Sequence, residues 1–355
     1  MNDFRQDPEG QASHAEEKVS SRYICTANHG FASYAQEELR RLFGAVKSML
    51  LLPGEIFIAT LQAEPEEVSR ILLANLPIFL RHIQPVQFQD EAGLPALGRL
   101  AVYLSRQSQL EGQTLSLQVR KSKDSFWQES PGELREWLQE ELKSLDAEFS
   151  VQEPAWVISV YADSDALYAG VSRPEENLSD WSGGAVRFRK EEGQISRAKF
   201  KLIEAEKEFG IPFNSFRRGL DIGAAPGGWT SFLLERGIQV TAVDPAHMHE
   251  SLKNYPGLKI LRKNANELKF SENEFDVIVC DMSWSPKLMA KMVTGLLHSL
   301  VPGGTAIVTV KLMHKKPLAM IKEIIEMFEA ERMQIQRAKQ LFHNRDEITL
   351  YMIKY

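Results

Sequence analysis

The stretch Arg218-Gly219-Leu220-Asp221-Ile222-Gly223-Ala224-Ala225-Pro226-Gly227-Gly228-Trp229 combines a short apolar strand, a turn of small residues and the start of a helix. Glycines at a strand-to-helix turn adopt backbone angles that other residues resist, and they let a ligand approach the main chain closely. Asp244 follows about 20 residues later, at the end of a second apolar run, where a carboxylate can accept hydrogen bonds from ribose hydroxyls. The stretch therefore predicts a site for a cofactor that contains a nucleoside.

The turn also indicates which cofactor fits. Pro226 removes an amide donor at the place where a diphosphate would need one. Asp221 adds a carboxylate at the end of the strand, which repels a diphosphate and suits an ammonium group. S-adenosylmethionine (SAM) has an adenosine and an ammonium and no phosphate, so the turn favours SAM over NAD. An NAD-dependent oxidoreductase is the disfavoured alternative, because the third glycine of the dinucleotide fingerprint is absent.

Length and composition limit the number of domains and the class of protein. The chain has 355 residues, of which 43% are hydrophobic and 25% charged, with a net charge of -6. These values predict two or three globular domains and exclude a surface that is basic throughout. Two separated cysteines, Cys25 and Cys280, indicate buried thiols in a reducing compartment, and no Cys/His spacing indicates a metal site. The polar first 18 residues and the lack of an apolar run of about 18 residues predict a cytoplasmic protein without signal peptide or membrane anchor.

The order of apolar patterns predicts an α/β protein with two α+β units before the cofactor-binding domain. We expect a disordered tail at 1–20, a ferredoxin-like α+β domain at 21–89, a second α+β domain at 90–172, a linker at 173–195 and the cofactor-binding domain at 196–355. In the last domain, strands and helices alternate as in a doubly wound, Rossmann-like fold. Strands are expected at 218–222, 238–243, 258–263, 275–281, 304–310, 334–342 and 347–354, and helices at 197–208, 227–236, 247–253, 287–300 and 315–331. Such a seven-stranded sheet ending in an antiparallel pair places its cofactor site at the carboxyl ends of the strands.

Two basic segments are candidate contacts for RNA. The end of the linker alternates cations with aromatic residues, which suits a single-stranded nucleic acid: Arg187, Phe188, Arg189, Lys190, Arg197, Lys199, Phe200 and Lys201. The second segment follows the strand at 115–119 and contains Arg120, Lys121 and Lys123, side chains of the type that contacts phosphates. The alternatives are a solvated linker with Phe200 in the core, and solvated charges at the edge of a sheet. Trp284 could equally stack on a base or pack against the protein.

Four charged residues are expected to converge at the carboxyl edge of the seven-stranded sheet. Lys201 lies in the helix before the first strand, Asp281 and Lys311 end strands, and Glu347 begins the last strand. Methyl transfer from a sulfonium to a ribose 2′-hydroxyl requires removal of a weakly acidic proton. A lysine with the reference pKa of about 10.4 is mostly charged at neutral pH, but burial and a second cation favour its neutral form. We therefore expect Lys311 as the base, with Lys201 as the neighbouring cation and the two carboxylates orienting the amines and the hydroxyl.

With these residues in view, the C-terminal half resembles the FtsJ-like ribose 2′-O-methyltransferases, whose Lys-Asp-Lys-Glu tetrad matches Lys201, Asp281, Lys311 and Glu347. It resembles most closely the bacterial RlmM family, which methylates a cytidine 2′-hydroxyl in large-subunit (23S) ribosomal RNA. The matching segments are 221–230, 280–282, 310–316 and 340–349. The N-terminal half resembles the ferredoxin-like plus THUMP arrangement of that family, which would make 90–172 a THUMP-like RNA-binding domain.

The resemblance implies a set of residues around SAM and a proton acceptor, Lys311. Together with the turn itself, it predicts cofactor contacts from Ser196, Asp221, Gly223, Ala225, Pro226, Gly227, Gly228, Trp229, Asp244, Asn264 and Asp281. Asn264 departs from the family, which tends to have an acidic residue near the adenine. Asp346 precedes Glu347, so either carboxylate could be the fourth member of the tetrad; Glu347 is preferred.

The combined features predict a SAM-dependent RNA ribose methyltransferase that acts on 23S ribosomal RNA or a ribosomal precursor, with no expected role for DNA or a membrane. The alternative from another class is an RNA-binding or ribosome-assembly factor with a degenerate methyltransferase fold. A base-methylating enzyme is disfavoured, because residues 281–286 do not form the Asn/Asp-Pro-Pro-Tyr-like loop that such enzymes usually have.

Overall fold

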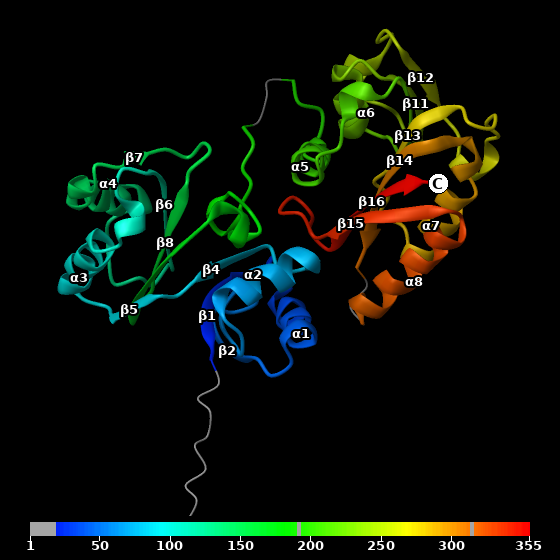
Figure 1. The fold of residues 1–355 in the computed structure, drawn as a ribbon. Helices are drawn as coiled ribbons and strands as arrows, with labels where there is room; N and C mark the ends of the chain where they lie inside the picture. Colours follow the sequence, from blue (N-terminus) through cyan, green and yellow to red (C-terminus); the bar gives the residue numbers. More distant parts are fainter. Residues whose placement is uncertain (1–18, 190–192, 313–315) are drawn as a thin grey trace, which may run out of the picture.

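Three patterns of strand alternation give three separate sheets in the computed structural model, which describes residues 19–189, 193–312 and 316–355 (Figure 1). The first sheet has four strands in the order β2-β3-β1-β4. Its elements are β1 (Ser21–Thr26), α1 (Ala32–Phe43), β2 (Lys47–Leu52), β3 (Ile56–Leu61), α2 (Pro65–Ala74) and β4 (His82–Pro85). β1 and β3 are almost entirely buried, whereas β2 forms an edge that is largely exposed.

The second sheet has five strands in the order β5-β9-β8-β6-β7 and its own apolar core. Its elements are β5 (Phe88–Glu91), α3 (Leu94–Ser105), η1 (Ser108–Leu110), β6 (Thr114–Lys121), α4 (Pro131–Glu141), η2 (Lys143–Leu145), β7 (Glu148–Phe149), β8 (Trp156–Ala162) and β9 (Ala166–Ser172). α4 begins with a capping box: Glu133 N donates to Ser130 Oγ (3.2 Å), and Ser130 N donates to Glu133 Oε2 (2.7 Å).

The segment after the second sheet, predicted to be a linker, is packed against both N-terminal sheets. It contains two short turns, η3 (Pro174–Asn177) and η4 (Ser182–Gly184). The carbonyl of Gly183 accepts a hydrogen bond from Arg81 Nε at 3.1 Å, and a Cβ at Gly183 would collide with the Arg120 guanidinium. Gly183 has a φ of +61°, so both its conformation and its surroundings require glycine.

The third sheet has the predicted seven strands, in the order β12-β11-β10-β13-β14-β16-β15. Its strands are β10 (Arg218–Ile222), β11 (Gln239–Val243), β12 (Leu258–Leu261), β13 (Phe275–Cys280), β14 (Leu300–Lys311), β15 (Met333–Lys339) and β16 (Glu347–Lys354). The five strands from β10 to β14 are parallel, and β16 runs antiparallel between β14 and β15. The Rossmann-like arrangement with its closing antiparallel pair is therefore confirmed.

Helices and short turns complete this domain. The helices are α5 (Lys199–Phe209), α6 (Gly228–Glu235), α7 (Pro286–Thr294) and α8 (Pro317–Ala330), and the turns are η5 (Phe213–Ser215), η6 (Glu250–Leu252), η7 (Ala265–Glu267) and η8 (Leu297–Ser299). The prediction of a helix at 247–253 was wrong, because only the short turn η6 forms there. The sequence of that segment, Met248-His249-Glu250-Ser251-Leu252, offers few apolar positions, and only Leu252 is buried in η6.

The four-stranded and seven-stranded domains share one continuous cluster of buried apolar side chains. Their backbones also meet, because Gln340 N donates to the carbonyl of Ile78 at 2.8 Å. In Figure 1 the loop between β15 and β16 extends toward the four-stranded domain. Cys25 and Cys280 are free and buried, as predicted. Within the described ranges, no helix is long and apolar enough to cross a bilayer, and no cluster of His, Cys, Asp and Glu could hold a metal ion.

Candidate active site

The glycine-rich turn lies between β10 and α6, where the sequence predicts it. Gly223 has a φ of +73° and Gly227 a φ of +116°, values that favour glycine. The atoms around these two positions give a second reason why glycine is required. A Cβ at Gly223 would collide with the Met282 side chain, and a Cβ at Gly227 would collide with Leu252. The turn therefore brings its backbone close to the segment that follows β13.

A cavity of about 290 Å³ opens at the carboxyl ends of β10, β11 and β13. Five of the predicted cofactor residues line it: Gly223, Ala225, Asp244, Asn264 and Asp281. Lys263, Met282 and the half-exposed Trp284 complete a mixed polar and apolar wall. The cavity therefore lies where the fold predicts a ligand, outside the carboxyl ends of parallel strands.

Asp244 is held in place by the backbone. Its Oδ2 accepts a hydrogen bond from Ala225 N at 3.1 Å, and its Oδ1 accepts one from Ala246 N at 2.7 Å. A carboxylate oxygen has two lone pairs, so each oxygen can still accept a hydrogen bond from a hydroxyl. Asp244 is thus held at the cavity wall with free capacity to accept further hydrogen bonds.

Asp221 has different surroundings from those that its place in the turn suggests. It is 1% exposed, and its Oδ2 accepts a hydrogen bond from Thr230 Oγ1 at 2.6 Å. It is not among the residues that line the cavity. Burial raises the pKa of Asp221 to about 7, against the opposing effect of the Thr230 hydrogen bond. The carboxyl group therefore lies inside the domain, beneath the turn.

Three other predicted cofactor residues join α6 to the start of α5. Trp229 is buried, and its indole Nε1 donates to the carbonyl of Ala198 at 2.8 Å. A Cβ at Gly228 would lie 3.0 Å from Ser196 Cβ, so the two backbones approach closely there. Neither these residues nor Pro226 and Gly227 line the cavity. In the structure, they fix the position of the helix that carries Lys201.

The structure brings the four predicted catalytic residues into one chain of contacts. Lys201 Nζ donates to Asp281 Oδ1 at 2.9 Å and lies 3.0 Å from Glu347 Oε1. Lys311 Nζ lies 3.4 Å from Glu347 Oε2. Each oxygen of Glu347 therefore faces a different lysine.

The charges in this chain stabilise one another. Burial lowers the pKa of Lys201, but the attraction of Asp281 and Glu347 outweighs it, and the pKa of Lys201 lies above its ordinary value. Burial raises the pKa of Glu347, but the positive charge and hydrogen bond of Lys201, together with the other contacts of the carboxylate, outweigh this effect. The pKa of Glu347 therefore lies below its ordinary value. Asp346, the alternative fourth member, has a side chain that is 60% exposed and an oxygen 4.0 Å from Lys311 Nζ. The geometry therefore favours Glu347 over Asp346 as the carboxylate between the lysines.

Asp281 belongs to both halves of the site. It lines the cavity, and it also contacts Lys201. Thr309 on β14 donates its hydroxyl to Asp281 Oδ1 at 2.8 Å. Thr309 was not predicted, because a buried threonine in an apolar strand has no distinguishing signal in the sequence. The cavity and the pair of lysines are thus separated by a single fixed carboxylate.

The side chain of Asn264, where the sequence departs from the family, is already paired. Its Nδ2 donates to Glu267 Oε1 at 2.5 Å. Glu267 lies in the adjoining turn η7 and supplies an acidic group next to Asn264. The amide and its acidic neighbour therefore stand together at this edge of the cavity.

The candidate RNA segment at 120–123 makes most of its contacts within the protein. Arg120, on β6, donates to Thr26 Oγ1 at 2.9 Å and to Gln84 Oε1 at 2.7 Å, both in the four-stranded domain. Burial lowers the pKa of Arg120 to about 10. Lys121 Nζ donates to the carbonyls of Trp127 (2.6 Å) and Glu129 (2.8 Å), so of the three basic residues only Lys123 is exposed. The expectation of solvated charges at a strand end was therefore wrong for Arg120. Its hydrogen bonds connect the five-stranded domain with the four-stranded domain.

The basic segment at the end of the predicted linker has exposed cations, but its aromatic rings pack within the protein. Phe188 stacks on His343 at a centroid distance of 5.2 Å, and Phe200 contacts the same ring at 5.2 Å. Lys199 is buried and forms an ion pair with Glu235 at 2.8 Å. The exposed cations of this segment are Arg187, Arg189 and Arg197, and Lys190 lies outside the described residues.

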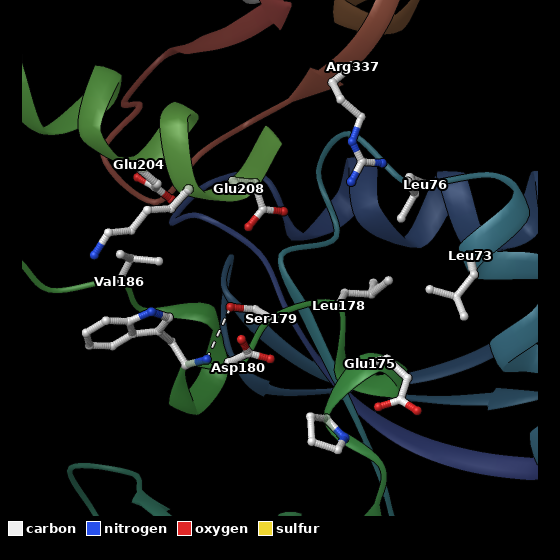
Figure 2. A pocket seen from close by; sticks show the side chains of 13 residues that line it. Leu73, Leu76, Glu175, Leu178, Ser179, Asp180, Val186, Glu204, Glu208 and Arg337 are labelled. Atoms are coloured by element: carbon white, nitrogen blue, oxygen red, sulfur yellow. Dashed lines mark hydrogen bonds between the residues drawn. The ribbon is translucent and has the colours of Figure 1, made fainter. Parts of the chain in front are cut away.

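A second hollow lies at the junction of the domains, away from the predicted residues. It has a volume of about 390 Å³ and is lined by α2, by the segment at 174–186, by α5 and by β15. Figure 2 shows Leu73 and Leu76 on one side of it and Glu204 and Glu208 on another. None of the predicted catalytic or cofactor residues lines this hollow. The smaller cavity at the strand ends is therefore the candidate active site.

Comparisons with known proteins agree with this geometry. Residues 194–332 match the family model described as FtsJ-like methyltransferase. The Ribosomal RNA large subunit methyltransferase M of Psychromonas ingrahamii is 35% identical over 205 residues, which covers 54% of this chain and 55% of that protein. The protein of the same name from Halorhodospira halophila is 33% identical over 196 residues, covering 54% of this chain and 56% of the relative. In these two matches the chain spans little more than half of the relatives' length.

A longer match is weaker in identity. The Ribosomal RNA large subunit methyltransferase M of Pseudomonas putida is 28% identical over 330 residues, covering 87% of this chain and 89% of that protein. Among solved structures, TrmN from Thermus thermophilus aligns with 94% of this chain and 100% of its own, at 15% identity and a TM-score of 0.40.

Proposed function

We propose that this protein transfers a methyl group from SAM to a ribose 2′-hydroxyl of RNA, because residues 194–332 match the FtsJ-like methyltransferase family model, a class that uses SAM. The observation that carries the proposal is the double role of Asp281. This carboxylate lines the cofactor cavity and pairs with Lys201, which in turn contacts Glu347. A methyl donor in the cavity and a base at Lys311 would therefore lie on either side of one short chain of contacts.

The residues around the cavity suit SAM. Asp244, fixed by two backbone amides, is placed for the ribose hydroxyls of the adenosine. The apolar walls at Val243, Ala265 and Met282 suit the adenine ring. Asp281 supplies a negative charge at the cavity wall, which suits the cationic amino-acid end of the cofactor.

When bound, SAM supplies a methyl group on a positively charged sulfur. In our proposal Lys311 Nζ, in its neutral form, accepts the proton of the 2′-hydroxyl while the oxygen bonds to the methyl carbon. The S–C bond of SAM breaks at the same time, its electron pair stays on sulfur, and S-adenosylhomocysteine leaves; the proton then passes from Lys311 to solvent. Lys311 has a side chain that is 35% exposed, so substrate can reach it. Lys201 stays charged because of its two carboxylate partners. Its positive charge repels a second positive charge beside the Glu347 carboxylate. Glu347 orients both amines through its two oxygens.

The proposed substrate is large-subunit ribosomal RNA, 23S RNA in bacteria, as the names of the relatives indicate for those proteins. The exposed cations Arg187, Arg189, Arg197 and Lys123 are the proposed phosphate contacts. We propose a THUMP-like, RNA-binding role for the domain at 90–172, and a cytoplasmic location follows from such a substrate.

The proposal is tested by incubating the protein with radiolabelled SAM and ribosomal RNA from a strain that lacks its gene. Alkali cleaves RNA next to a free 2′-hydroxyl, so methylated ribose leaves an alkali-resistant dinucleotide. We expect the label in such a dinucleotide. Label in a single nucleotide after alkaline hydrolysis would indicate base methylation instead. SAM binding without transfer to any RNA would favour an RNA-binding or assembly factor.

A further inference from the structure

The loop between β15 and β16 positions the carboxylate of the candidate active site. It leaves β15 after Lys339 and returns at Glu347, the first residue of β16. Inside the loop, Asn344 Oδ1 accepts hydrogen bonds from Leu341 N at 2.8 Å and from Thr349 Oγ1 at 3.1 Å. The geometry of this loop therefore decides where the oxygens of Glu347 lie relative to Lys201 and Lys311.

The loop is held from outside its own domain by Asn28. This residue follows β1 of the four-stranded domain and is 7% exposed. Its Nδ2 donates to the carbonyl of Leu341 at 2.8 Å and to the carbonyl of Asn344 at 3.0 Å. The two bonded pairs are separated by 313 and by 316 residues along the chain. One amide group thus uses both of its N–H donors on the loop.

The orientation of the Asn28 amide is set by Arg81. Arg81 Nη1 donates to Asn28 Oδ1 at 2.6 Å, which turns the opposite side of the amide, Nδ2, toward the loop. The Arg81 guanidinium also lies 5.2 Å from the centroid of the Phe342 ring, on the same loop. Arg81 is itself held through Nε by the carbonyl of Gly183. The four-stranded domain therefore presents a prearranged donor to the loop.

One peptide unit connects Asn28 to the catalytic carboxylate. The carbonyl of Asn344 accepts from Asn28, and the N–H of the same peptide unit, that of Arg345, donates to Glu347 Oε1 at 3.1 Å. A peptide unit is planar, so its C=O and N–H rotate together. Rotation that frees the carbonyl from Asn28 also turns the N–H away from Glu347. That oxygen of Glu347 is the one 3.0 Å from Lys201.

We propose that Asn28 is a positioning residue for the methyl transfer: by holding the peptide unit between Asn344 and Arg345, it fixes the Glu347 carboxylate between Lys201 and Lys311. This proposal rests on the proposed function. Part of the candidate active site is then built by the N-terminal half of the chain, and the C-terminal domain alone would lack it. Misplacement of a catalytic group by about 1 Å can lower a rate about 100-fold.

The test compares three variants of the full chain. Asn28→Asp keeps the shape of the side chain and the acceptor for Arg81, but it replaces both donors to the loop with an acceptor oxygen. Asn28→Ala removes the amide altogether. Thr26→Val is the matched control, because it also removes a buried polar contact between domains, the one with Arg120 Nη1, but none with the loop. For each variant, SAM affinity, RNA affinity and the single-turnover rate at saturating SAM and RNA are measured.

We expect Asn28→Asp and Asn28→Ala to lower the single-turnover rate about 10- to 100-fold, with SAM affinity within about 2-fold of wild type. Thr26→Val should keep the wild-type rate. A wild-type rate in Asn28→Asp would overturn the proposal. So would an equal loss of rate in Thr26→Val, because it would indicate a general effect of domain contacts. Absence of transfer by the wild-type protein would instead refute the proposed function itself.

The pH profile supplies a readout that a purely structural role would leave unchanged. The hydrogen bond from Arg345 N is one of the contacts that lower the pKa of Glu347. The charged groups around Glu347 are Lys201 on α5, Lys311 on β14, the neighbouring Asp346, and Asp281 on the far side of Lys201, and none of them changes in the variants. In Asn28→Ala, which adds no charge, loss of the Arg345 bond raises the pKa of Glu347. The ratio of the variant's rate to the wild-type rate, in which the other titrating groups cancel, should therefore fall toward acid pH. A rate ratio for Asn28→Ala that stays constant toward acid pH would contradict the proposal.

Discussion

Asp221 offers a quantitative test of the electrostatics beneath the glycine-rich turn. Burial raises its pKa from the ordinary value of 3.8 to about 7. The native state therefore holds a proton that the unfolded state has lost, between about pH 4 and pH 7, and the free energy of unfolding falls as pH rises through this window. The difference of about 3 pH units corresponds to about 4 kcal/mol lost across the whole window, to order of magnitude.

The variant Asp221→Asn isolates this contribution. The amide keeps the shape of the side chain and an oxygen that accepts the hydrogen bond from Thr230, but it has no proton to lose. Between pH 5 and pH 8 the variant should gain about 2 to 3 kcal/mol in unfolding free energy relative to wild type. Urea unfolding of both proteins, followed by fluorescence at each pH, measures this difference, and all other titrating groups cancel in it. A difference that stays constant between pH 5 and pH 8 would refute the reasoning.

Four further substitutions test other parts of the account. Arg120→Met should lower the unfolding free energy by about 2 to 4 kcal/mol in thermal or urea unfolding, because buried partners lose a charged donor. The same variant should leave the salt dependence of RNA binding unchanged. Lys123→Met, in contrast, should reduce that dependence if Lys123 contacts a phosphate. Gly223→Ala places a methyl group against Met282 at a φ of +73° and should weaken SAM binding at least about 10-fold in calorimetry; unchanged affinity would exclude the close approach of the turn to the ligand. Asp244→Asn should weaken SAM binding by about 1 to 3 kcal/mol while methylthioadenosine, which has the same ribose, loses a similar amount; a loss confined to SAM would contradict a ribose contact.

Features that depend on local pattern could be predicted from the sequence. The seven strands of the C-terminal domain follow from apolar runs separated by turn residues, and β10 and β16 have the predicted bounds. Residues 194–332 match the FtsJ-like methyltransferase family model, as the resemblance predicts. The convergence of Asp281, Lys311 and Glu347 was predictable for a geometric reason: the carboxyl ends of neighbouring parallel strands and the start of an antiparallel strand lie at the same edge of a sheet. Their catalytic roles remain a proposal.

Features that depend on distant partners could not be predicted. Arg120 looked like a solvated charge, but its partners Thr26 and Gln84 belong to another sheet. Phe188 and Phe200 looked like stacking platforms for bases, but they pack on His343, more than a hundred residues later in the chain. No local signal distinguishes these pairings from their alternatives, because the energy comes from contacts that only the folded chain creates.

The central claim is that Lys311 removes the proton from a ribose hydroxyl while SAM is held separately in the cavity. The most direct measurement combines calorimetric SAM binding with single-turnover methyl transfer for the wild type and for Lys311→Ala. The account predicts SAM affinity within about 2-fold of wild type, because Lys311 does not line the cavity, and a transfer rate lower by at least about 1,000-fold, because the reaction loses its base. Retained turnover in Lys311→Ala, with SAM still bound, would contradict it.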